Sequence, residues 1–408
     1  MSEVKSLKCR ECPEEYEISP KYVCDMCFGP LEISYDWKEI KKSVNKDSIT
    51  NGPKSIWRYK SLLPIDGNDV IDIGTGFTPL ISADNLSNFL GLKKIWIKND
   101  SVNPTYSFKD RVVSVASTKA KEFNFDTFAC ASTGNLAGSV AAHGAKAGFR
   151  TLVFIPSNLE NEKIVAASIY GPEVVAIKGN YDDVNRLCTE LAETKPWAFV
   201  NINLRPFYSE GSKTVGFEIA EQLGWKTPDH IIAPAASGSL FIKVWKGFNE
   251  FFKIGLIENP QNTRMHIAQP EGCSPIATSF NEGKTHPLPV IPKTIAKSLA
   301  IGNPADGYYA IKLAKKTQGS AHAVSDNEIV KGISLLARTE GIFTETAGGV
   351  VIATLVKMVK QGLISKDEEV VVLITGNGLK TQEVVSSLSA PTEINPTIKS
   401  FEDTFPNY

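Results

Sequence analysis

From about residue 93 the chain alternates short apolar runs with longer stretches of helical character. The first half of this region shows strand-like runs in KKIWIKND, TFACAS, TLVFIP and EVVAI. Between and after them come helix-like runs in SFKDRVVSVASTKAKEF, GNLAGSVAAHGAKAG, EKIVAASIYG and YDDVNRLCTELAE. The same rhythm continues through AFVNIN, SKTVGFEIAEQLG, DHIIAPAAS and RMHIAQPEG to EVVVLITGNG. Apolar strands separated by helices are typical of parallel sheets covered on both faces, so the pattern predicts an α/β fold.

The first 35 or so residues differ, because they hold four of the seven cysteines. Cys9 and Cys12 form one C-x2-C pair, and Cys24 and Cys27 form a second pair after eleven intervening residues. Two such pairs can close a tetrahedral site of four thiolates around zinc. We predict a structural zinc-ribbon-like module here. The alternatives are four free cysteines in a loose tail and a redox C-x-x-C site.

Composition and charge narrow the function classes. The 408 residues are 42% hydrophobic and 22% charged, with a formal net charge of -1, so no basic excess points to nucleic acid. The longest apolar runs, such as VVVLIT at 370–375, are too short to span a bilayer. The stretch MSEVKSLKCRECPEE lacks the apolar core of a signal peptide, and we therefore expect a cytoplasmic protein.

Three turns after predicted strands carry small or hydroxyl-bearing residues. ASTGN (131–135) offers the hydroxyls of Ser132 and Thr133 beside the amides of a helix start, which suit a carboxylate or phosphate, although such residues also cap helices. PAASGSL (234–240) leaves backbone amides open to a phosphate, because its residues are small: Ala235, Ala236, Ser237, Gly238 and Ser239. TGNGLK (375–380) places the Thr375 hydroxyl at the end of the most apolar strand.

The stretch NPTYSFKDR (103–111) places Lys109 at the start of a predicted helix. The sequence contains no P-loop, G-x-G-x-x-G or G-x-S-x-G motif, and its five histidines form no i, i+4 pair. Nucleotide-binding, hydrolase and metalloenzyme functions are therefore poorly supported. One lysine, two anion-binding turns and one hydroxyl instead suit pyridoxal phosphate, whose aldehyde needs an amine and whose phosphate needs a helix start.

NPTYSFKDR resembles the NPTGSFKDR signature of threonine synthases, which belong to the tryptophan-synthase-β-like, fold-type II family of pyridoxal-phosphate enzymes. Further segments resemble that family in the same order, from about residue 70 to 385: ASTGN, GNYDD, EGSKTVGFEIAEQLG, AKSLAIGNPADGYYA, TEGIFTETAGG and TGNGLK. The resemblance implies two parallel-sheet domains with flanking helices beside the small N-terminal module. The expected divisions are a zinc-ribbon-like module (1–36), a large cofactor domain (37–99 and 191–390), a smaller domain (100–190) and a C-terminal tail (391–408).

The resemblance also implies the roles of individual residues. Lys109 would bond the cofactor aldehyde and then move protons, Phe108 would adjoin the ring, and Asn135 would bond the phenolic oxygen of the cofactor. The turn from Ala235 to Ser239 would hold the cofactor phosphate, and Thr375 would face the ring nitrogen. Ser132 and Thr133 would receive the substrate carboxylate. The implied reaction converts O-phosphohomoserine and water to threonine and phosphate, and the family expectation is a homodimer.

Two positions depart from the family pattern. Tyr106 replaces the usual glycine three residues before the lysine. Tyr208 stands where many threonine synthases carry an arginine thought to meet the substrate phosphate. A dianionic substrate needs a cation, so Arg205 and Lys213 are the candidates to supply it.

Other residues and other functions stay open from sequence alone. We expect Asp110 and Arg111 to form a structural ion pair or cap, while Glu345 could touch the active site or serve a helix start. The region 273–305 is rich in Pro, Gly and Ser and predicts a loop near a ligand or an interface. The alternative functions are a cysteate synthase that uses O-phosphoserine and sulfite, an amino-acid ammonia-lyase, and a non-catalytic binding protein that carries the cofactor.

Overall fold

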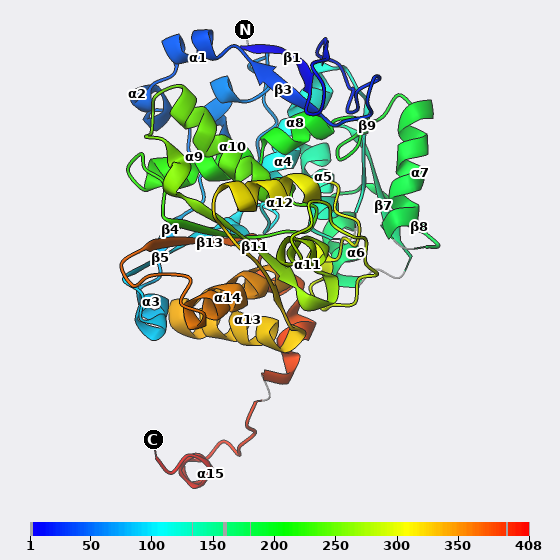
Figure 1. The fold of residues 1–408 in the computed structure, drawn as a ribbon. Coiled ribbons are helices and arrows are strands. Elements are labelled where there is room, and N and C mark those ends of the chain that lie inside the picture. Colours follow the sequence, from blue (N-terminus) through cyan, green and yellow to red (C-terminus); the bar gives the residue numbers. More distant parts are fainter. Residues whose placement is uncertain (1–2, 133, 158–160, 180, 389–390, 408) are drawn as a thin grey trace.

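The computed structural model describes residues 3–132, 134–157, 161–179, 181–388 and 391–407. Figure 1 shows two sheets wrapped by helices, with the N-terminal module at the top of the view and the C-terminal segment projecting from the bottom. The predicted α/β fold with two parallel sheets is confirmed. Within the described residues, we find no helix with the length and apolar character needed to cross a bilayer.

The N-terminal module is a three-stranded antiparallel sheet in the order β2-β1-β3. Its strands are β1 (Val4–Cys9), β2 (Glu15–Tyr16) and β3 (Leu31–Tyr35). Alternate residues of β3 are buried, namely Leu31, Ile33 and Tyr35, and this face packs on α8 (Arg205–Glu210). So short a sheet encloses little core of its own, which is why such modules are usually held together by a metal.

The smaller parallel sheet has the order β8-β7-β6-β9. Its strands are β6 (Thr127–Ala131), β7 (Arg150–Pro156), β8 (Glu173–Ile177) and β9 (Ala198–Phe199). Alternate residues of β6 point to opposite faces: Phe128 and Cys130 join the main core, whereas Ala129 and Ala131 face a second cluster that contains Val184 and Cys188. The helices of this part are α4 (Lys109–Glu122), α5 (Asn135–Ala147), α6 (Asn161–Ser168) and α7 (Tyr181–Thr194).

The larger sheet has the order β12-β11-β10-β13-β5-β4, and only the edge strand β4 is antiparallel among its described strands. Its strands are β4 (Leu80–Ser82), β5 (Lys94–Asn99), β10 (His230–Pro234), β11 (Arg264–Pro270), β12 (Ala321–Val324) and β13 (Glu369–Ile374). In Figure 1 one face is covered by α9 (Lys213–Gln222), α10 (Ser239–Lys253) and α12 (Gly307–Lys316). The other face is covered by α3 (Asp84–Leu90), α13 (Asp326–Glu340) and α14 (Thr346–Lys360).

The remaining elements are short. They are α1 (Trp37–Ser43), α2 (Lys46–Thr50), η1 (Ile56–Leu62), η2 (Asp100–Val102), η3 (Pro260–Asn262), η4 (Glu271–Cys273), α11 (Pro275–Asn281), η5 (Lys297–Leu299), η6 (Gly378–Lys380), η7 (Gln382–Leu388) and α15 (Ile398–Thr404). Helix α11 lies inside the region predicted as a loop, so that prediction was wrong for these residues. Strand β9 pairs with β6 although it lies beyond residue 190, and we propose that the smaller domain extends through β9.

A buried ion network fixes the start of α4. Arg111 Nε and Nη2 donate to Asp100 Oδ2 and Oδ1 at 2.6 and 2.8 Å, and Nη2 also donates to Glu218 Oε2 at 2.8 Å. Lys98 Nζ donates to the same Glu218 oxygen at 2.6 Å. All four side chains are buried. Burial alone would raise the pKa of Glu218, but Arg111 and Lys98 lower it to about 2.

This network corrects one detail of the sequence interpretation. Arg111 does not pair with Asp110. Asp110 instead accepts hydrogen bonds from Thr105 N at 2.7 Å, Thr105 Oγ1 at 2.6 Å and Ser139 Oγ at 2.6 Å. The network of Arg111 therefore ties α4 to the end of β5 and to α9, while Asp110 ties it to the preceding turn and to α5.

We predict that Arg111→Met lowers the free energy of unfolding by about 3–5 kcal/mol, because it leaves Asp100 and Glu218 buried without their main cation. The measurement is urea denaturation followed by tryptophan fluorescence. The matched control is Arg150→Met, since Arg150 pairs with Glu173 on the surface with both side chains more than half exposed. That control should lose at most about 1 kcal/mol. Equal losses in the two variants would contradict the structural importance of the network.

Candidate active site

A cavity of about 490 Å³ lies where the two sheets meet. It is lined by residues that follow the carboxyl ends of β6, β10 and β13 and by the first residues of α4, α5 and α10. Parallel α/β sheets bind ligands at this edge, because strand ends and helix starts converge there. Part of the region 273–305 also lines the cavity, at Ser298, Leu299, Ile301, Asn303 and Ala305.

Lys109 is the first residue of α4, and its side chain lines the cavity. Phe108 N donates to Thr375 O at 3.0 Å, which fastens the start of α4 to the end of β13. Lys109 Nζ lies 3.2 Å from the hydroxyl of Tyr208 and 4.8 Å from the centre of the Phe108 ring. Within the described part of the chain, Lys109 forms no ion pair with a carboxylate. Its amine is therefore available for chemistry in the cavity.

The turn between β10 and α10, where the sequence predicts an anion cradle, is a tight turn that leads into a helix start. Gly238 has φ +97°, and a Cβ there would approach Asp306 O and Ala310 Cβ at 3.1 Å, so glycine suits this close approach. Gly238 precedes a helix of 15 residues whose start has no capping side chain, apart from a long 3.4 Å bond from Ser239 N to Ser237 Oγ. The free amides of such a helix start bind phosphate.

Four of the five residues predicted to form the cradle line the cavity, and one does not. Ala236, Ser237, Gly238 and Ser239 line the cavity. Ala235 does not, because it is buried and its amide continues the sheet by donating to Ala268 O at 3.0 Å. The cradle therefore begins one residue later than the sequence suggested.

Thr375 and Asn135 complete the opposite wall. Thr375 follows β13 and is buried at the cavity lining. Asn135 begins α5, and its Nδ2 donates to both carboxylate oxygens of Glu345 at 3.0 Å, while its Oδ1 accepts from Lys380 Nζ at 3.0 Å. Glu345 stands at the start of α14 without capping it, and it lines the cavity. Of the two roles open for Glu345, the structure therefore favours contact with the site.

Of the two hydroxyl residues predicted to bind the substrate carboxylate, Ser132 and Thr133, the structure describes only Ser132. Ser132 lines the cavity, but its Oγ accepts from Gly134 N at 3.1 Å and Ala137 N at 3.0 Å, so the hydroxyl also caps α5. Thr133 lies outside the described residues.

The two residues predicted to supply a cation for the substrate, Arg205 and Lys213, lie in different places, and only Arg205 lines the cavity. Arg205 lines the cavity, and its Nη2 donates to Asp306 Oδ2 at 2.9 Å. Lys213 is fully buried away from the cavity lining and bonds Glu210 at 2.7 Å, Glu250 at 2.7 Å and the Tyr35 hydroxyl at 3.1 Å. The expectation that Lys213 binds substrate is not supported, because buried carboxylates on α8 and α10 already hold its amine.

Of the two tyrosines that depart from the family pattern, Tyr208 lines the cavity and Tyr106 does not. Tyr106 has φ +60°, a conformation that favours glycine, and it lies half exposed outside the cavity lining. Its side chain therefore does not narrow the cavity. Tyr208 lines the cavity and contacts Lys109. The sequence analysis noted only that Tyr208 replaces the expected arginine and did not predict its contact with Lys109.

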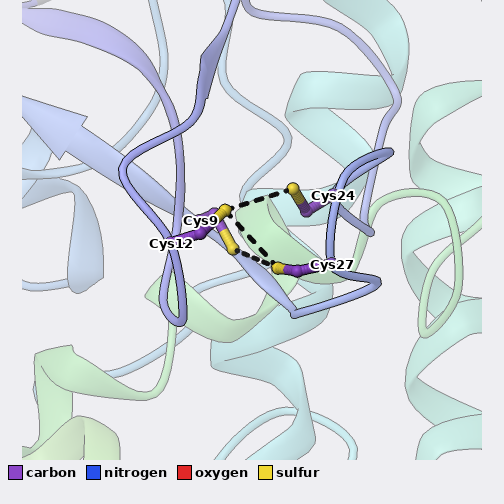
Figure 2. Close-up of side chains that lie close together, drawn as sticks. All are labelled: Cys9, Cys12, Cys24 and Cys27. Atoms are coloured by element: carbon purple, nitrogen blue, oxygen red, sulfur yellow. Dashed lines mark hydrogen bonds between the residues drawn. The ribbon is translucent and has the colours of Figure 1, made fainter.

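The four N-terminal cysteines converge on one point in Figure 2, two from each of the tight C-x2-C turns, which we call the first knuckle (9–12) and the second knuckle (24–27). Their Sγ atoms all lie within 4.8 Å of one another. Cys9 and Cys27 are 3.5 Å apart, Cys12 and Cys24 are 3.6 Å apart, and Cys27 and Cys12 are 3.4 Å apart. A tetrahedral site with Zn–S bonds of about 2.3 Å has sulfur atoms roughly 3.8 Å apart. The cluster is therefore compatible with a zinc-ribbon-like site.

The donor set of the cavity, an amine, an anion cradle and a buried hydroxyl, fits pyridoxal phosphate. The family model described as "Pyridoxal-phosphate dependent enzyme" matches residues 71–376. The chain therefore belongs to the family of pyridoxal-phosphate dependent enzymes.

Relatives within this family point to a particular activity. A threonine synthase of Methanocaldococcus jannaschii is 38% identical over 377 residues, which cover 91% of this chain and 92% of the relative. A threonine synthase of Methanosarcina acetivorans is 37% identical over 402 residues, which cover 97% and 98%. The solved structure of Escherichia coli diaminopropionate ammonia lyase shares the fold, with a TM-score of 0.66, 21% identity and coverage of 78% of this chain and 88% of that one.

Proposed function

We propose that the chain is a threonine synthase, which converts O-phosphohomoserine and water to threonine and phosphate. The observation that carries the proposal is the meeting of Lys109, the 236–239 cradle and a second cation, Arg205, in one cavity. The threonine synthase relatives support it, since two of them match this chain over 91% and 97% of its length.

Four groups of the chain would hold pyridoxal phosphate. Lys109 Nζ would bond its aldehyde carbon, the amides of 237–239 would bind its phosphate, Thr375 would meet its ring nitrogen and Asn135 its phenolic oxygen. When bound, the cofactor withdraws electrons from the substrate carbons, which makes their protons removable. Glu345 and Lys380 hold the two ends of the Asn135 amide and so fix its orientation.

Lys109 would move the protons of the reaction. Its Nζ removes the proton from the substrate Cα and serves later transfers at Cβ and Cγ, for which a local and mobile base is needed. The Tyr208 hydroxyl, 3.2 Å away, orients the amine toward the cavity. The Ser132 hydroxyl lies at the start of α5, where it and the neighbouring amides would receive the substrate carboxylate.

Arg205 would bind the phosphate of the substrate. Among the described residues that line the cavity itself, Lys109 and Arg205 carry the positive charge. With Lys109 engaged by the cofactor, Arg205 is the cation left for a phosphate dianion, and guanidinium groups bind phosphate well.

We further propose that the enzyme works in the cytoplasm as a homodimer, that it needs no nucleic acid or membrane, and that zinc binds to Cys9, Cys12, Cys24 and Cys27. The dimer follows from the family resemblance. The zinc proposal is supported by the convergence of the four Sγ atoms.

The direct test supplies the purified enzyme with O-phosphohomoserine and quantifies threonine and phosphate. We predict equal amounts of the two products, and a loss of at least about a thousandfold in Lys109→Ala, since both the cofactor bond and the general base are removed. O-phosphoserine with sulfite runs in parallel. Turnover of that pair without threonine formation would show a cysteate synthase instead.

Arg205→Gln separates phosphate-substrate chemistry from ammonia-lyase chemistry. We predict that this variant raises the KM for O-phosphohomoserine about tenfold to a hundredfold, because a charge-assisted phosphate contact is lost, while the cofactor absorbance is retained. Arg205→Lys should recover part of the loss. An unchanged KM would remove Arg205 from the substrate site, and release of the cofactor would assign it to the cofactor phosphate.

Metal analysis tests the ribbon. We predict one zinc per chain in the purified protein and less than about one tenth of that in Cys12→Ser, because a structural zinc site needs all four ligands. Cys273→Ala, which changes a buried thiol outside the cluster, should keep the metal. A metal-free wild-type protein with full stability would contradict the zinc proposal.

A further inference from the structure

The cysteine module reaches the rim of the cavity through Arg10, which lies between Cys9 and Cys12 in the first knuckle. The Arg10 guanidinium carbon is 3.5 Å from the centre of the Tyr309 ring on α12, and the Arg10 side chain is 18% exposed. Its Nη1 lies 3.7 Å from Asp306 Oδ1. The neighbouring Glu11 also accepts a hydrogen bond from the Tyr309 hydroxyl, so the knuckle is docked on the start of α12.

Asp306 belongs to the cavity lining and faces two arginines. Its Oδ2 accepts from Arg205 Nη2 at 2.9 Å, while Oδ1 faces Arg10. Its backbone amide donates to Ser237 O at 3.0 Å, which holds the carboxylate beside the anion cradle. One buried carboxylate is thus shared between an arginine of the cysteine module and an arginine of the cavity.

The sharing decides the net charge of the group formed by Arg10, Arg205 and Asp306 at the cavity. Two guanidinium groups and one carboxylate sum to +1, so one positive charge remains for an anion. Without Arg10, Asp306 and Arg205 sum to zero, and an anion gains little from the neutral pair. Glu32 lies 3.8 Å from Arg10, but it belongs to a cluster whose three carboxylates are already balanced by three lysines: Glu32, Glu210 and Glu250 face Lys213, Lys243 and Lys246. Arg10 therefore remains available to Asp306.

We infer that Arg10 is a positioning residue for the phosphate of the substrate, acting through Asp306 to leave the charge of Arg205 available. The inference rests on the proposed function, since it takes Arg205 to be the substrate-phosphate cation. It gives the cysteine module a role in the site, because the knuckle that carries Arg10 is held in shape by the thiol cluster and by the bond from Arg10 N to Pro30 O at 3.1 Å.

The experiment measures two constants on the full-length enzyme loaded with cofactor: the KM for O-phosphohomoserine and the Kd for inorganic phosphate by calorimetry. We expect Arg10→Gln to raise both about tenfold and to change kcat less than about twofold, with the zinc content unchanged. Arg10→Lys, which keeps the charge, should recover most of the affinity. The matched control is Lys8→Gln, which removes one exposed positive charge from the same module and should change neither constant.

A second variant keeps the inference falsifiable should Arg10→Gln fold poorly. Asp306→Asn should lower the Kd for inorganic phosphate, since the Arg205 guanidinium then loses its carboxylate partner, and adding Arg10→Gln to it should change that Kd less than about threefold, because Arg10 acts through that carboxylate. An unchanged phosphate Kd in folded Arg10→Gln, or the full tenfold loss when Asp306 is absent, would overturn the inference. Wild-type enzyme that binds phosphate but makes no threonine would refute the proposed function alone.

Discussion

The buried pairing of Arg111 with Asp100 and Glu218 is the interaction on which the site depends. It joins the first turn of α4 to the end of β5 and to α9, and Lys98 completes its charge balance. Successive residues of a helix point in different directions, so holding Asp110 and Arg111 inward leaves Lys109 directed into the cavity. The direction of the Lys109 amine is thus set by charged side chains that lie outside the cavity lining.

The presence or absence of a carboxylate partner explains which lysine amines are available to a ligand. Lys109 has a hydroxyl neighbour and no carboxylate partner among the described residues, whereas Lys213 is held by Glu210 and Glu250. Burial alone would raise the pKa of Glu210, but Lys213, Lys243 and Lys246 hold it well below its usual value. That cluster also bonds Tyr35 of the cysteine module, so it fastens the module to the enzyme rather than binding substrate.

Much of this architecture could be predicted from sequence, because the relevant signals are local. Apolar runs revealed the strands of the smaller sheet and β5, β10, β11 and β13 of the larger one, but not the short strands β4 and β12. The small residues of 236–239 marked a turn that lines the cavity, and the cysteine spacing revealed the cluster. The contacts that the sequence missed are long-range. The partner of Lys213 on α10, the bond between Asn135 and Glu345, and the sharing of Asp306 by Arg10 and Arg205 join residues far apart in the chain. No local pattern marks such pairs before the fold is known.

The most direct measurement of the central claim is borohydride reduction of the purified, cofactor-loaded enzyme, followed by proteolysis and mass spectrometry. Reduction makes the bond between an amine and the cofactor aldehyde permanent. The account predicts a pyridoxyl group on the peptide that contains Lys109, at close to one per chain. A modified lysine elsewhere, or no modified peptide in enzyme that retains activity, would contradict the placement of the cofactor in this cavity.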